Sequence, residues 1–205
     1  MEHPRSLTAY HVPMSQALLA FLIALTALST NAATLTVDVR NARGVPMQDA
    51  VIYAVREDRD AAAPARRTAV MDQKNRMFIP HVLPVQVGTA VSFPNSDDIR
   101  HQVYSFSAPK MFQLPLYTGT PANPIVFDKP GVVILGCNIH DRMSAYIVVV
   151  DTPHFAATGR DGRVTLPNLG AGKYVVHVWH ADLSADPVPL HLGASDQRDL
   201  TFVVQ

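Results

Sequence analysis

Four residues of the sequence could together bind one soft metal ion, and three of them lie close together in the chain. Cys137, His140 and Met143 follow one another at intervals of three residues, and His101 lies well upstream. A thiolate and a thioether stabilise Cu(I), imidazole suits both oxidation states of copper, and one Cys, two His and one Met form the trigonal His₂Cys centre with a weak axial Met. These residue types predict a single copper ion in an electron-transfer site.

Short predicted strands flank the loop that carries three of these residues. The apolar run Val132–Leu135 precedes the cysteine, and the run Ile147–Val150 follows the methionine, so residues 137–143 form a tight loop between two strands. Both runs predict strands buried on both faces. The period-two alternation over residues 85–93 predicts another strand, which ends shortly before His101. Loops anchored on strands can hold one ligand geometry in both oxidation states.

Strand patterns continue along the rest of the chain. Leu35–Val39, Ala50–Val55, Tyr174–Trp179 and Leu200–Val204 are apolar or alternating, and Pro and Gly turns separate such runs. No stretch after Ala33 has a convincing helical period. The sequence therefore predicts an all-β fold, either a sandwich or a barrel.

The N-terminal residues predict export. Ala17–Leu28 is an uncharged apolar run of twelve residues, too short to span a bilayer comfortably, with Arg5 upstream and small residues from Ser29 to Ala33. This is typical of a secretory signal peptide, which we assign to residues 1–32. We expect a periplasmic protein with no stable membrane insertion after cleavage. A buried core helix and an uncleaved anchor are the alternatives.

Composition narrows the function further. Seventeen Lys plus Arg balance seventeen Asp plus Glu, and this zero net charge argues against nucleic acid as a partner. The single cysteine excludes an internal disulfide and a cluster held by several cysteines. Because an unpaired thiol is at risk in an oxidising compartment, we favour a thiolate occupied by metal over a buried, inert cysteine.

The middle of the chain resembles the cupredoxins, including plastocyanin and amicyanin. The resemblance covers roughly residues 66–151 and is carried by three stretches: FIP at 78–80, VQVGTAVSFPN at 85–95, and GCxxHxxM at 136–143, with His101 between the last two. The spacing from Cys137 to Met143 matches the short ligand loop of amicyanin. The arrangement also resembles exported proteins named methylamine-utilisation proteins. The resemblance implies a Greek-key β-sandwich in which His101, Cys137 and His140 are the strong equatorial ligands and Met143 is the weak axial one.

The segments on either side of residues 66–151 resemble two halves of another small domain. Residues 34–60 and 152–205 are similar to the first and second halves of the carboxypeptidase-regulatory-like domain, a transthyretin-like β-sandwich. This resemblance implies that the cupredoxin-like segment is an insertion. In the alternative, residues 34–58 are extra strands of the middle domain.

Two positions depart from the usual cupredoxin pattern. Ile139 precedes the second loop histidine, where many cupredoxins have proline, and its N–H is free to donate a hydrogen bond to the Cys137 sulfur. Gln102 follows the upstream histidine, where asparagine is common. Asn95 or Asn138 is therefore the alternative clasp between the two ligand loops.

Other residues that could do chemistry have simpler interpretations. His177 and His180 lie three apart and so cannot face the same side of a strand. The adjacent acids Asp97 and Asp98 are typical of a solvated turn rather than a hard-cation site. Aromatic residues near the site are core residues by default, with shielding of the metal or an apolar docking patch as alternatives: Tyr104, Phe106, Phe112 and Tyr117.

The sequence as a whole favours a protein that carries single electrons between transient redox partners. A periplasmic copper carrier or buffer with the same ligands is the first alternative, and a metal-free interaction module is the second. We predict no enzyme, no catalytic residue and no organic cofactor, because the four ligands leave no vacant metal position for a substrate.

Overall fold

The computed structural model describes residues 32–58, 63, 66–121 and 123–205. Within these residues the chain forms seventeen strands and no helix, which confirms the all-β prediction. The predicted signal peptide lies outside the described residues except for Ala32. Among the residues described, no helix has the length and apolar character needed to cross a membrane.

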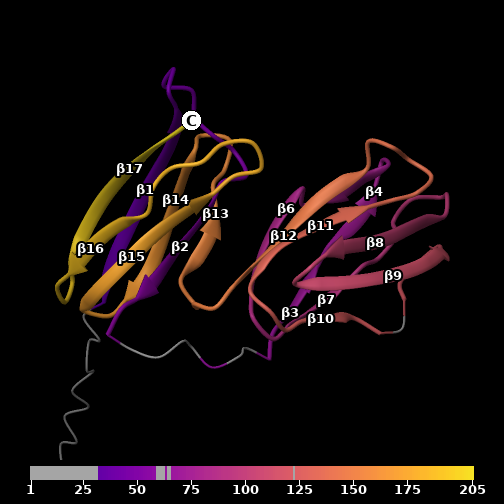
Figure 1. Ribbon diagram of the computed structural model, residues 1–205, viewed down its shortest axis with the longest axis horizontal. Helices are drawn as coiled ribbons and strands as arrows, with labels where there is room; N and C mark the ends of the chain where they lie inside the picture. The colour runs from indigo at the N-terminus through magenta and orange to yellow at the C-terminus, as the bar shows by residue number, and fades with distance from the viewer. Residues whose placement is uncertain (1–31, 59–62, 64–65, 122) are drawn as a thin grey trace, which may run out of the picture. The chain divides into compact units, whose positions relative to one another are not determined.

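Seven strands come from the segments on either side of residues 66–151 (Figure 1). Their bounds are β1 (Ala33–Asn41), β2 (Val51–Arg56), β13 (Phe155–Ala157), β14 (Arg163–Leu169), β15 (Gly172–Trp179), β16 (Val188–Leu192) and β17 (Gln197–Val204). In one sheet β1 lies between β14 and β17, antiparallel to the first and parallel to the second. The other sheet has the order β13-β2-β15-β16. Residues 33–56 are therefore hydrogen-bonded to residues 155–204.

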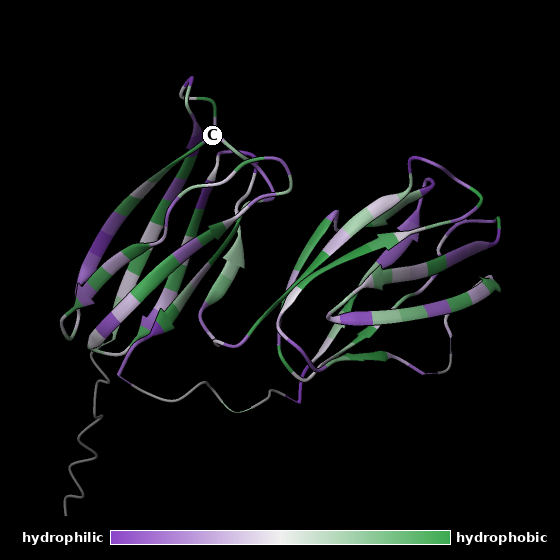
Figure 2. Cartoon of the chain, viewed as in Figure 1, coloured by the Kyte–Doolittle hydropathy of each residue, from purple (hydrophilic) through white to green (hydrophobic). Residues whose placement is uncertain are grey.

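The alternation in these strands buries one face of each sheet. Leu35, Val37 and Val39 are fully buried, and the residues between them are partly exposed. Figure 2 shows the resulting bands of hydrophobic and hydrophilic residues along the strands. Their core includes Leu166, Tyr174 and other apolar side chains from both sheets.

The other ten strands carry the predicted ligands. Their bounds are β3 (Thr68–Val70), β4 (Asp72–Lys74), β5 (Met77–Ile79), β6 (Val82–Gln86), β7 (Thr89–Ser92), β8 (His101–Ser107), β9 (Lys110–Tyr117), β10 (Ile125–Phe127), β11 (Gly131–Gly136) and β12 (Ser144–Val150). They form a five-stranded sheet of order β6-β12-β11-β8-β9, a three-stranded sheet of order β10-β7-β3 and the hairpin β4–β5. Apolar residues from both sheets form a second core, which includes Val91, Phe127, Val133 and Ile147.

Two strand predictions in this region were partly wrong. The alternation over residues 85–93 is not one strand: Gly88, with a φ of 90°, turns the chain between β6 and β7, which join different sheets. β12 is buried along Ile147–Val150 as predicted, but Ile134 on β11 is 52% exposed. A continuous apolar run does not distinguish a strand buried on both faces from one that has an apolar outer face.

The core between the sheets of β1 and β2 should respond strongly to truncation. Leu35→Ala removes a fully buried side chain from β1. We expect it to lower the free energy of unfolding by about 2–5 kcal/mol, because the lost burial is accompanied by a cavity. Urea denaturation monitored by circular dichroism measures the change. Leu116→Ala, at a side chain that is 46% exposed, is the control and should cost much less; equal losses would contradict this account of the core.

Candidate metal centre

His101 is the first residue of β8 and has no exposed surface. Its Nε2 lies 2.7 Å from Oδ2 of Asp97, four residues earlier in the chain. An ionised carboxylate accepts hydrogen bonds but has no proton to donate. This contact therefore favours the His101 tautomer with the proton on Nε2. The Nδ1 lone pair is then available on the other side of the ring, where Nδ1 lies 3.9 Å from the sulfur of Cys137.

Asp97 is itself held by a neighbouring hairpin. Its two carboxylate oxygens accept the backbone N–H groups of Asn75, at 2.6 Å, and Arg76, at 2.9 Å. Both donors lie in the turn between β4 and β5 and have positive φ angles of 55° and 58°. Burial alone would raise the pKa of Asp97, but the Arg76 N–H, the His101 ring and the Asn75 N–H outweigh it and hold the pKa below its ordinary value. The carboxylate is thus a fixed anchor for the His101 ring.

The loop between β11 and β12 brings two more donors to the same point. The N–H of His140 donates to the Cys137 carbonyl oxygen at 3.4 Å, and the N–H of Met143 donates to the His140 carbonyl oxygen at 2.9 Å. These two successive turns fold the loop back, so that Nδ1 of His140 lies 3.8 Å from the Cys137 sulfur. The imidazole rings of His101 and His140 are 4.9 Å apart, at an interplanar angle of 57°.

The three donor atoms form a group that fits a metal ion. The sulfur of Cys137 and one ring nitrogen from each of His101 and His140 all lie within 4.8 Å of one another. Bonds of about 2.0–2.3 Å, the range for imidazole and thiolate on zinc, separate three donors around an ion by roughly 3.5–4.0 Å. The two sulfur–nitrogen distances of 3.8 and 3.9 Å lie in that range. A soft thiolate with two imidazoles is a donor set that suits copper.

Met143 lies at the end of the same loop and is 2% exposed. It belongs to the buried apolar cluster that also contains Cys137, which is 5% exposed. Both residues line the same cavity beside the loop. The predicted fourth residue is therefore in the neighbourhood of the cysteine, on a loop whose backbone is fixed by the two turns.

The two departures from the cupredoxin pattern have different outcomes. The hydrogen bonds found for the described residues do not include one from the Ile139 N–H to the Cys137 sulfur. Asn95 does not join the two ligand loops: its side-chain amide donates to the carbonyl oxygens of Ile99, in the upstream loop, and Tyr117, at the end of β9. Asn138 is exposed and lines the cavity beside the loop.

Sequence reasoning missed the role of Asp97. The prediction of a solvated turn at Asp97–Asp98 holds for the exposed Asp98 but is wrong for Asp97, whose side chain is 12% exposed and contacts His101. The spacing of four residues between Asp97 and His101 was the available signal. It gave no hint of the hairpin turn at Asn75 and Arg76, which lies more than twenty residues upstream.

Other singled-out residues lie outside the donor group. His177 stacks on Tyr53 with ring centroids 4.8 Å apart, and the His180 ring accepts the N–H of Asp182. Phe112 packs against Phe93 in the core.

Tyr117 is half-buried beside the site, opposite His101 in the ladder of β8 and β9. Its hydroxyl donates to the Phe93 carbonyl oxygen and accepts from the side chain of Gln73. Burial, opposed by the Gln73 hydrogen bond and reinforced by the charges of Cys137 and Asp72, raises the pKa of Tyr117 to about 12. The phenol therefore stays neutral next to the donor group.

Comparison with known proteins gives structural similarities only. No family model matches the sequence, and no curated protein matches it significantly. A purple cupredoxin from Nitrosopumilus maritimus is 22% identical, with 41% of this chain and 99% of that chain covered and a TM-score of 0.35. A reduced amicyanin variant is 23% identical, with 48% and 99% covered and a TM-score of 0.37. A copper-containing nitrite reductase from Thermus scotoductus is 25% identical, with 56% and 28% covered and a TM-score of 0.37.

Removing the charge of Asp97 tests its role as the anchor of the His101 ring. We expect Asp97→Asn to lower the affinity for copper about 10–100-fold, because the neutral amide has one acceptor oxygen in place of two and cannot accept both the hairpin N–H groups and the His101 ring N–H. Competition with a chromophoric copper chelator measures the affinity. Asp98→Asn removes a charge from the exposed neighbouring residue and should leave the affinity nearly unchanged; equal losses in the two variants would mean that only the net charge of the turn matters.

Proposed function

We propose that this chain is a type 1 copper protein that carries single electrons between redox proteins. The observation that supports the proposal is the convergence of the His101 and His140 nitrogens on the sulfur of Cys137. In this proposal His101, Cys137 and His140 are the strong ligands, and Met143 is the weak axial one. Copper bound there would supply a one-electron couple between its cupric and cuprous states.

The surroundings of the donors suit that task. Cys137 directly follows β11, His101 begins β8, and the Asp97 carboxylate and the β4–β5 turn hold the His101 ring. Donors fixed before the metal binds do not need to rearrange when its charge changes. Burial of Cys137 and Met143 keeps water from the sulfur donors. Four donors from the chain leave no vacant position for a substrate, so we propose electron transfer rather than catalysis.

His140 is the proposed edge through which electrons enter or leave. Its side chain is partly exposed, whereas His101 is fully buried. The exposed Ile139, at 49%, lies beside it on the loop. The chain has no net charge to steer a partner over long distances, so we propose weak, transient encounters with redox proteins through this apolar edge.

We also propose that the chain is divided into two domains. Residues 66–151 would be the cupredoxin domain, inserted into a small transthyretin-like sandwich of residues 34–60 and 152–205. The pairing of β1 and β2 with strands after residue 154 supports this division. The proposed location is the periplasm, on the strength of the signal-peptide pattern in residues 1–32.

The absorption spectrum of the purified protein with one equivalent of Cu(II) tests the function. We expect an intense orange-red band from charge transfer between thiolate and copper, which Cys137→Ala abolishes because the sulfur is removed. The exposed-loop variant Ile139→Ala is the control and should keep the band. Reversible bleaching by a reductant and fast electron self-exchange are expected of an electron carrier. Tight binding with a pale spectrum would favour the copper carrier instead.

The reduction potential of the copper centre tests the role of Met143. Met143→Leu keeps the volume and the apolar character of the side chain but removes the thioether sulfur. We expect the orange-red band to persist and the potential to rise, because a lost sulfur donor destabilises the cupric state more than the cuprous one. Met71→Leu, at a fully buried methionine of the same core, is the matched control. Equal potentials for the two variants would show that Met143 is only a core residue.

A further inference from the structure

An aromatic ring lies against the residue that precedes the cysteine. Tyr104 on β8 is the ladder partner of Gly136, the last residue of β11. A Cβ atom on Gly136 would lie 2.6 Å from both the hydroxyl oxygen and the adjacent ring carbon of Tyr104. Contacts this short do not occur between real side chains, so the ring occupies the space that a side chain at position 136 would need. Glycine is therefore required for this close approach.

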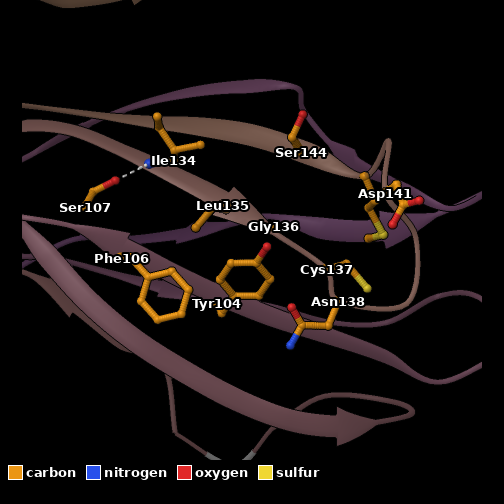
Figure 3. A pocket seen from close by; sticks show the side chains of 11 residues that line it. Tyr104, Phe106, Ser107, Ile134, Leu135, Gly136, Cys137, Asn138, Asp141 and Ser144 are labelled. Carbon is orange, nitrogen blue, oxygen red and sulfur yellow. Dashed lines mark hydrogen bonds between the residues drawn. The ribbon is translucent and has the colours of Figure 1, made fainter.

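A second ring continues from the first toward solvent. Phe106 lies two residues further along β8, on the same face, and its ring centroid is 5.2 Å from that of Tyr104, at an angle of 43°. Figure 3 shows the two rings next to each other, with the Tyr104 hydroxyl directed toward Gly136 and Cys137. Phe106 is 73% exposed, an unusual position for a phenylalanine. Across from it on β9, Met111 is 68% exposed.

The same rings line the cavity beside the ligand loop. This open cavity of about 590 Å³ is lined by Tyr104 and Phe106 together with Cys137, Asn138 and Met143. Its lining comes from β8, β11, the loop and the start of β12, and it lies beside the two buried residues that carry the sulfur atoms. This face is different from the His140 edge proposed above.

We propose that Tyr104 and Phe106 form a second electron route, from Cys137 through the Gly136–Tyr104 contact to the exposed Phe106. This inference rests on the proposed function. With copper bound, one electron would pass from a reduced partner at Phe106 to Cu(II), entering through the Cys137 thiolate, and the reverse step would return it from Cu(I) to an oxidised partner. The two rings provide electronic coupling: they gain and lose no electron, no bond forms or breaks, and no proton moves.

A photoactive label beside Phe106 tests this route. Cys137 is the only native cysteine, so with copper bound a ruthenium polypyridyl label can be attached selectively to M111C. Flash reduction of the label then gives the rate of electron transfer to Cu(II). We expect Tyr104→Leu and Phe106→Leu each to slow this rate severalfold while the orange-red band is retained.

A second label position separates the route from a general disturbance of the site. T118C places the label on an exposed residue after the far end of β9, past the ladder partner of His101. Tyr104→Leu should leave the rate from this label unchanged. Unchanged rates from position 111, or equal slowing from both positions, would overturn the proposal. Should Tyr104→Leu fail to fold, Gly136→Ala provides a second variant, because its Cβ displaces the Tyr104 ring.

A measurement without copper keeps the inference distinct from the proposed function. Copper is removed after labelling at position 111, and an external electron acceptor converts the photoexcited label to Ru(III). Ru(III) then takes one electron from the Tyr104 phenol, whose proton passes to solvent, and the phenoxyl radical is detected by its absorption. Its loss in Tyr104→Phe is expected, and its persistence would overturn the route. If the orange-red band is absent while this radical forms, the proposed function fails but the coupling from position 111 to Tyr104 stands.

Discussion

The arrangement of the candidate centre depends on one hydrogen bond, between Nε2 of His101 and the carboxylate of Asp97. A fully buried imidazole can rotate and can carry its proton on either nitrogen, and both freedoms must be removed before Nδ1 faces the cysteine. The carboxylate removes them because two backbone N–H groups of a separate hairpin hold it in place. The turn at Asn75 and Arg76, with its positive φ angles, is therefore part of the candidate site, although neither residue contributes one of the three donor atoms. The β4–β5 hairpin thus orients the His101 imidazole through Asp97.

The other two donors are positioned by the short loop that carries them both. Cys137 and His140 lie on a loop that joins two adjacent antiparallel strands, so their separation is set by two backbone turns and not by distant packing. One donor residue is thus held by tertiary contacts and two by local geometry. This division explains why the local pair is easy to recognise in a sequence and why the surroundings of the distant histidine are not.

Sequence patterns predict the local features of the site but miss the contacts that are made across the fold. The donor types, the loop between strands and the all-β class were accessible because spacing and alternation are local properties. The alternation over residues 85–93 misled because it continued through Gly88, where the chain changes sheets. Asp97 was assigned to solvent because its partners come from a turn far away in sequence, and the outward face of Ile134 was hidden in an unbroken apolar run. What could not be predicted is which residues meet across the fold, since hydrophobic pattern sets the face of a strand but not its neighbours.

The parallel pairing of β1 with β17 has a consequence for the order of folding. Thr34 is registered with Gln197 and Asn41 with Val204, so β1 cannot complete its sheet until residues 197–204 have been synthesised. The strands of residues 68–150 pair only among themselves, and their contacts are available much earlier. During synthesis, β1 and β2 must wait with their apolar faces unpaired while the segment between them and their partners is made. The part of the chain that carries the candidate metal centre can therefore be ready to fold before the strands that precede it in sequence.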